Sequence, residues 1–123
     1  MNRTQLPFLV EGILILATIL VGYFLGKKGK PYGKVKLVIH IFFYLWFTMG
    51  FVFIARALYT AKTATVIWDP VIIMGLAILT QLVTGTVMLA SKKVGKTLTA
   101  IHVTSAILLL LSDVCAFFIA GSH

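Results

Sequence analysis

Four long apolar runs constrain this chain more than any other feature of its sequence. The runs cover residues 7–26, 37–60, 71–91 and 98–120. Each is long enough for an α-helix, which rises about 1.5 Å per residue, to cross about 30 Å of hydrocarbon. Inside lipid, backbone polar groups must be satisfied within the segment, and a helix does this. The sequence therefore predicts an all-α membrane protein with four transmembrane helices in an up-down bundle.

The composition supports a lipid environment and excludes other classes of protein. Of the 123 residues 60% are hydrophobic and 11% are charged, whereas soluble domains carry roughly 25% charge. The net charge of +8 does not indicate nucleic acid, because the apolar runs leave no soluble basic surface. The single cysteine, Cys115, excludes an internal disulfide, and we expect it to be buried. One transmembrane domain spanning residues 1–123 is expected, with the lipid bilayer as its first partner.

Basic residues predict the orientation of the bundle. Eight of the eleven lie in or beside the first and third connections, namely Lys27, Lys28, Lys30, Lys34, Lys36, Lys92, Lys93 and Lys96. The positive-inside rule places these lysine-rich loops in the cytoplasm and both termini outside. We expect the membrane to be the plasma membrane of a bacterium or archaeon.

The chain contains an internal repeat. A Gly-Lys pair, four variable residues and Ile-His occur at Gly33–His40 and again at Gly95–His102, 62 residues later. Upstream, Gly12 and Gly22 align with Gly75 and Gly85 at an offset of 63. The repeats, about 7–61 and 70–121, predict two helical hairpins of the same orientation. Parallel repeats are related by a pseudo-two-fold axis along the membrane normal.

The repeat places His40 and His102 at matching depths, roughly 6–9 Å inside the cytoplasmic boundary. The pseudo-two-fold axis would bring the two imidazoles to opposite sides of the bundle centre. Facing imidazoles in a helix bundle are axial ligands of haem iron, so we hypothesise one bis-histidine haem b, with both histidines as metal ligands.

The residues around the histidines fit a flat cofactor. Gly22 and Gly85 lie at about the histidine depth, where a missing side chain allows close approach. Three groups of side chains are expected to surround the macrocycle: the aromatic wall Phe43, Tyr44 and Phe47; the small residues Ser105 and Ala106; and Lys36 and Lys96, which would bind propionates. Hydrogen bonds from Thr18, Gln81 or Thr84 are expected to orient the imidazoles.

Other interpretations of the two histidines remain open. Each imidazole can instead hydrogen-bond a neighbouring helix without any ligand. Copper is a second metal candidate, with Met74 or Met88 as a soft ligand. Two histidines are too few for a closed zinc site, which takes four ligands.

The histidine pair makes the chain resemble small four-helix b-type cytochromes, which hold haem between spans with two histidines. The resemblance implies b-type haem, one-electron transfer and often quinone as donor or acceptor, in a carrier or in a subunit of a redox complex with partner membrane subunits. The chain departs from larger relatives with two haems, because the outer halves of its spans contain no histidine pair. Electron transfer is the only enzymatic chemistry the sequence offers. The alternatives are a structural or assembly subunit without cofactor and a small proton-coupled transporter, since Glu11 superficially resembles the acid of small multidrug resistance proteins.

Two acids lie in the apolar runs. Asp113 is 11 residues past His102 and therefore shares its helix face, while Glu11 lies at a broadly similar level near the outer end of the first run. An acid within a span is a functional candidate, so the pair is a candidate quinone or proton site. We nevertheless expect Glu11 to be interfacial, and leave open whether Asp113 only bonds a neighbouring helix. His123, which ends the chain, is expected to be exposed.

Overall fold

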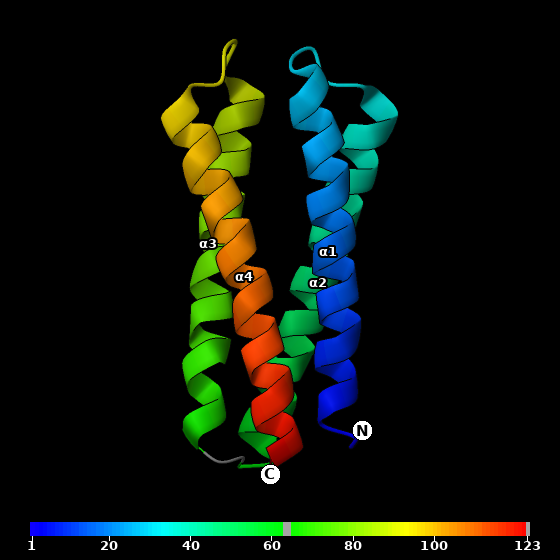
Figure 1. Cartoon of the computed structure of the whole chain (residues 1–123), viewed down its shortest axis with the longest axis vertical. Helices are drawn as coiled ribbons and strands as arrows, with labels where there is room; N and C mark the ends of the chain where they lie inside the picture. Colours follow the sequence, from blue (N-terminus) through cyan, green and yellow to red (C-terminus); the bar gives the residue numbers. More distant parts are fainter. Residues whose placement is uncertain (63–64, 123) are drawn as a thin grey trace.

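Four long helices run the length of the molecule in alternating directions (Figure 1). The computed structural model describes residues 1–62 and 65–122; His123 lies outside them. The helices are α1 (Gln5–Lys28), α2 (Lys34–Thr60), α3 (Trp68–Ala90) and α4 (Lys96–Ser122), with a short 3₁₀ helix η1 (Thr65–Ile67) before α3. Each is long and apolar enough to cross a membrane. The predicted all-α, four-helix membrane fold is confirmed.

The helices are longer than the apolar runs from which they were predicted. α1 begins at Gln5 and continues to Lys28, and α2 and α4 begin at the lysines of the repeated motif. Lysine and glutamine are good helix formers, so the helices extend past the hydrocarbon. Ser91 is an exception. It was predicted to lie within the third span, but it is the C-cap that follows α3.

The repeated Gly-Lys pair marks the start of both α2 and α4. The carbonyl oxygens of Gly33 and Gly95 accept hydrogen bonds from the amides of Leu37 and Thr99, at 3.0 and 3.1 Å. Both glycines thus occupy the position whose carbonyl accepts the first bond of a helix. α2 and α4 are each 27 residues long. At the end of α1, Gly29 adopts a φ of +69°, a left-handed conformation that costs little only for glycine.

The helices pack as two hairpins, α1–α2 and α3–α4, which are joined along the contact between α1 and α4. α2 and α3 touch over a short stretch only, and among the described residues the diagonal pairs α1–α3 and α2–α4 make no backbone contact. We call the end with the connections 29–33 and 91–95 the loop end, and the end with both termini the terminal end. In Figure 1 the hairpins lie close at the terminal end and separate toward the loop end.

A narrow core lies inside a surface of large apolar side chains. Its largest fully buried members are Phe8, Ile15, Phe47, Ile67, Val71, Met74 and Leu109. Many leucine, isoleucine, valine and phenylalanine side chains are more than a third exposed on the outside, as lipid contact requires. Cys115, which we expected to be buried, also lies on this exposed surface.

Side chains tie α1 to α4 at the terminal end. Asn2 Nδ2 donates to the carbonyl of Ala120 at 2.9 Å, and Gln5 Nε2 donates to that of Phe117 at 3.3 Å. Ala120 belongs to the last turn of α4, where carbonyls lack a later amide, and Phe117 lies one turn earlier. The start and end of the chain are therefore held together.

Two other side chains join the hairpins. Lys30 Nζ, in the first connection, donates to the carbonyls of Leu89 (3.1 Å) and Ser91 at the end of α3, where the helix dipole favours a cation. Near the middle, Tyr44 Oη donates to the carbonyl of Ile78 at 2.7 Å. This bond links α2 to α3, the neighbouring helices with least contact.

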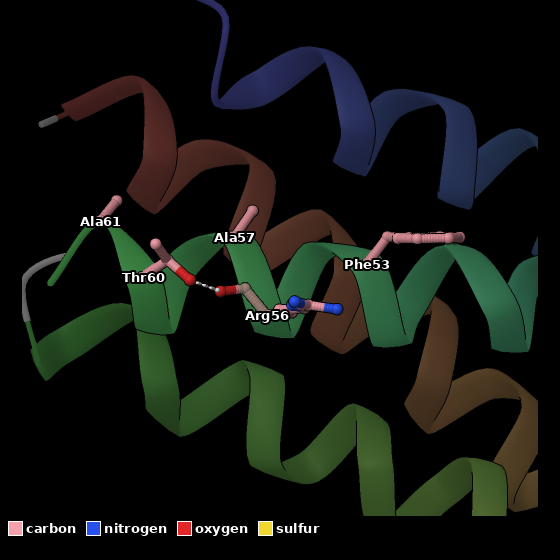
Figure 2. Close-up of a pocket in the computed structure, with 5 residues that line it drawn as sticks. All are labelled: Phe53, Arg56, Ala57, Thr60 and Ala61. Carbon is pink, nitrogen blue, oxygen red and sulfur yellow. Dashed lines mark hydrogen bonds between the residues drawn. The ribbon is translucent and has the colours of Figure 1, made fainter.

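A shallow groove lies along α2 near the terminal end (Figure 2). It is lined by Phe53, Arg56, Ala57, Thr60 and Ala61. The Thr60 hydroxyl donates to the backbone carbonyl of Arg56 at 2.9 Å, and the guanidinium extends along the outside of the helix (Figure 2). Arg56 is exposed at the surface of the bundle.

Tyr44→Phe tests the bond between α2 and α3. The substitution removes the hydroxyl that reaches Ile78 and keeps the buried ring, so we expect a loss of about 0.5–1.5 kcal/mol in the free energy of unfolding. Thermal or denaturant unfolding of the purified protein in detergent measures it. Tyr23→Phe, at a tyrosine that is 63% exposed, is the control and should change nothing; equal effects of the two variants would contradict the assignment.

Candidate functional site

His40 and His102 lie at equal depth on diagonally opposite helices. Each is the seventh residue of its helix, α2 or α4, so both lie near the loop end. Because α1 and α4 join the hairpins, α2 and α4 face each other across the bundle.

The imidazole of His40 is anchored to α1. Its Nδ1 lies 2.9 Å from the backbone carbonyl oxygen of Thr18. A carbonyl oxygen only accepts hydrogen bonds, so Nδ1 of the neutral ring carries the proton. The lone pair of the neutral ring is then on Nε2, which is the nitrogen available to a metal.

The imidazole of His102 is anchored to α3 in an equivalent way. Its Nδ1 lies 2.7 Å from the hydroxyl oxygen of Thr84. That hydroxyl donates its single proton to the carbonyl of Thr80, four residues earlier, at 2.7 Å. The oxygen therefore accepts from Nδ1–H of His102, and this ring too has its lone pair on Nε2.

Both histidines thus hold the tautomer in which metal-binding imidazoles occur. In the described part of the chain, their ring hydrogen bonds are made through Nδ1 alone. A bond that orients the ring through its second nitrogen is typical of histidine ligands. Two of the three predicted orienting residues supply this bond, although Thr18 does so through its backbone rather than its hydroxyl.

Gln81, the third predicted orienting residue, contacts the backbone beside His102 instead of the ring. Its Nε2 lies 2.5 Å from the carbonyl of His102 and 2.5 Å from the hydroxyl of Ser105. The Ser105 hydroxyl also donates to the His102 carbonyl, at 2.9 Å. Gln81 and Ser105 therefore fix the position of α4 against α3 at the backbone of His102.

A glycine lies against each imidazole. A Cβ atom added at Gly22 would be 2.8 Å from Cε1 of His40, closer than real Cβ atoms approach; at Gly85 it would be 3.6 Å from Cε1 of His102, an ordinary contact. Each histidine packs on the glycine predicted to share its depth. Only at Gly22 does the close approach of the imidazole require a residue without a side chain.

The predicted aromatic wall divides into two parts. Phe47 is buried and its ring packs edge-on against Tyr44, with centroids 5.2 Å apart. Phe43 instead stacks on Trp46 at 6.4 Å and contacts Phe42, and these two partners are more than half exposed. Tyr44 and Phe47 face the interior of the bundle, whereas Phe43 belongs to a cluster at its surface.

The remaining predicted residues lie around the histidines as follows. Ala106 is half-buried on α4, one turn beyond His102. Lys36 is in the first turn of α2, with its Nζ 5.9 Å from the ring centroid of Phe24, and Lys96 is the exposed first residue of α4. Both lysines therefore lie toward the loop end from the imidazoles.

Glu11 and Asp113 are brought together in the half of the bundle nearer the terminal end. Each is 2% exposed, and the Asp113 carboxyl group lies against Gly12, the residue next to Glu11 on α1. Glu11, which we expected at the membrane interface, is buried between the helices. The reason is that α1 turns this side chain toward α2, where Gly50 leaves the space it fills, while Asp113 on α4 fills the space beside Gly12.

The donor set limits what the histidine site can bind. In residues 1–62 and 65–122, no three His, Cys, Asp or Glu side chains gather around one point. If two imidazoles were the only protein ligands of a free metal ion, water would have to fill most of its coordination positions. They suffice for a metal whose other ligands come from a macrocycle.

Comparisons with known proteins do not assign the site. The chain matches no protein-family model, and searches of curated proteins and of solved structures gave no significant match.

Alanine at the two glycines should have opposite effects. Alanine is favoured over glycine in a helix by up to about 1 kcal/mol, and Gly85 has room for a methyl group, so Gly85→Ala should stabilise the protein. Gly22→Ala should not give this stabilisation, because the added methyl group displaces the His40 ring. Unfolding of both variants in detergent measures this; equal stabilisation would contradict the packing of His40 on Gly22.

Proposed function

We propose that the protein is an integral membrane b-type cytochrome in which His40 and His102 hold one haem between the two hairpins. The observation that carries the proposal is the pair of imidazoles at equal depth on diagonal helices, each with Nδ1 anchored and Nε2 free. Helix packing alone does not need the same tautomer at two symmetric positions.

The residues present fit the group. Two neutral imidazoles complete the coordination of haem iron, and bound haem b supplies a one-electron carrier. Threonine groups on α1 and α3 hold the rings from behind, as ligands in the outer shell of metal sites do. Lys36 and Lys96 supply cations at the loop end, where propionates would emerge.

The proposed electron path is short. The only other histidine of the sequence is His123, at the chain end, so the spans contain no second pair for another haem. We infer that electrons enter or leave through a quinone or a partner membrane subunit. By the positive-inside rule, the lysine loops and the haem face the cytoplasm.

The absorption spectrum of the purified protein, after haem is supplied, tests the proposal. We expect a Soret band and the spectrum of low-spin, six-coordinate haem, because both axial positions are filled by imidazole. His40→Ala and His102→Ala should each abolish this low-spin spectrum, whereas His123→Ala should keep it.

Four results would contradict the proposal. A protein that takes up no haem, or one that keeps the low-spin spectrum in both histidine variants, has no such clamp. Binding of copper in place of haem, lost in the same variants, would support the copper alternative. A colourless protein that copurifies with a larger membrane complex would support a structural role.

Thr84→Val tests the anchor of His102. Valine keeps the shape of threonine but cannot accept the Nδ1–H bond, so haem affinity should fall by about 10–100-fold, as for other outer-shell partners. Titration of haem into the protein measures the affinity. Thr86→Val is the matched control, since its hydroxyl bonds only to Leu82 of its own helix, at 2.7 Å; equal losses in the two variants would contradict the role of Thr84.

A further inference from the structure

The two buried acids form a site separate from the histidines. Glu11 is 11 residues before Gly22, and Asp113 is 11 residues after His102. At about 1.5 Å per residue, the carboxyl groups lie roughly 16 Å along the bundle from the imidazoles. Glu11 Oε2 and Asp113 Oδ1 are buried and have no hydrogen-bonding partner among the described residues.

Glycines on the facing helices make room for both carboxyl groups. A Cβ atom at Gly50 of α2 would lie 2.1 Å from Glu11 Oε1, and one at Gly12 of α1 would lie 2.7 Å from Asp113 Oδ2. Each acid therefore reaches the backbone of a neighbouring helix. The glycines let two buried side chains fit where any larger residue would displace them.

No cation faces the pair from the helices packed against it. On α2 the nearest ionisable side chains to Gly50 are Tyr44, bonded to Ile78, and Arg56, which is exposed and lines the outer groove. On α3 the only acid, Asp69, is exposed in the first turn, next to the terminal end. The carboxyl groups thus have each other as their nearest charged neighbours.

The nearby hydroxyl groups do not donate to the acids either. The Ser112 hydroxyl on α4 donates to the carbonyl of Leu108, and the Thr48 hydroxyl on α2 donates to that of Tyr44, both at 2.7 Å. Two adjacent carboxylates without a cation or a donor, inside a membrane, are too costly to stay fully charged. Binding of one proton to either group removes one of the two charges.

We propose that Glu11 and Asp113 form a proton-binding site in which one of the two buried carboxyl groups carries a proton. The site does not depend on haem, because neither acid touches the histidines. Its ligand is a proton exchanged with water, and the terminal end is the nearer surface, since Glu11 lies only six residues from Gln5 at the start of α1.

Infrared spectroscopy of the full chain in liposomes tests the site. The sequence has only three acids, Glu11, Asp69 and Asp113, so carboxyl bands are assignable. At neutral pH we expect the C=O stretch of a protonated carboxyl, equal to one acid per chain and shifted in D₂O. The double variant Glu11→Gln with Asp113→Asn should lose the band, and Asp69→Asn should keep it.

Two intensities would overturn the proposal. Absence of the band means that both groups are ionised, and an intensity of two acids per chain means that both are neutral. A band that remains in the double variant comes from another group and would also contradict the proposal.

A second pair of variants tests the geometry. Gly50→Ala should shift or abolish the band, because the added methyl group occupies the place of Glu11 Oε1. Gly26→Ala on α1 is the control, since a Cβ there meets nothing within 4 Å. Circular dichroism confirms that both variants remain helical. An unchanged band in Gly50→Ala would overturn the placement of Glu11.

Discussion

The constraint behind this structure is that polar groups inside a bilayer find their partners within the protein. The backbone meets it by forming helices. The side chains meet it locally: the hydroxyls of Thr18, Thr48 and Ser112 donate to carbonyls four residues back on their own helices. Away from the helix ends, the side chains that reach other helices are few, and they are the imidazoles, Tyr44, Gln81, Thr84 and the two acids. Those few groups position the helices and provide the candidate chemistry.

The helices and their order could be predicted from the sequence because both follow from local patterns. Apolar runs of sufficient length specify spans, and the repeated Gly-Lys pair appears in the structure as the start of α2 and of α4. The ends were less accurate, since polar residues such as Lys34 continue a helix beyond the hydrocarbon. The equal depth of His40 and His102 also follows from spacing alone.

The directions of individual side chains could not be predicted in the same way. Phe43, Tyr44 and Phe47 follow His40 at helical spacing, yet Phe43 stacks with exposed Trp46 while Phe47 is buried. Glu11 was misplaced because its burial depends on Gly50, a residue on another helix that no local pattern connects to it. Glycine positions in neighbouring spans were the available signal: each buried ionisable side chain of this bundle contacts one.

The unequal packing around the bundle has a consequence for how it deforms. α1 and α4 join the hairpins, whereas α2 and α3 meet only briefly, with the Tyr44–Ile78 bond between them. Rotation of one hairpin about the α1–α4 contact breaks few interactions on the opposite side. The seam between α2 and α3 is therefore the least costly place for the interior to open sideways to lipid. Opening of that seam would expose the interior on the side of α2 and α3, away from the lysine loops.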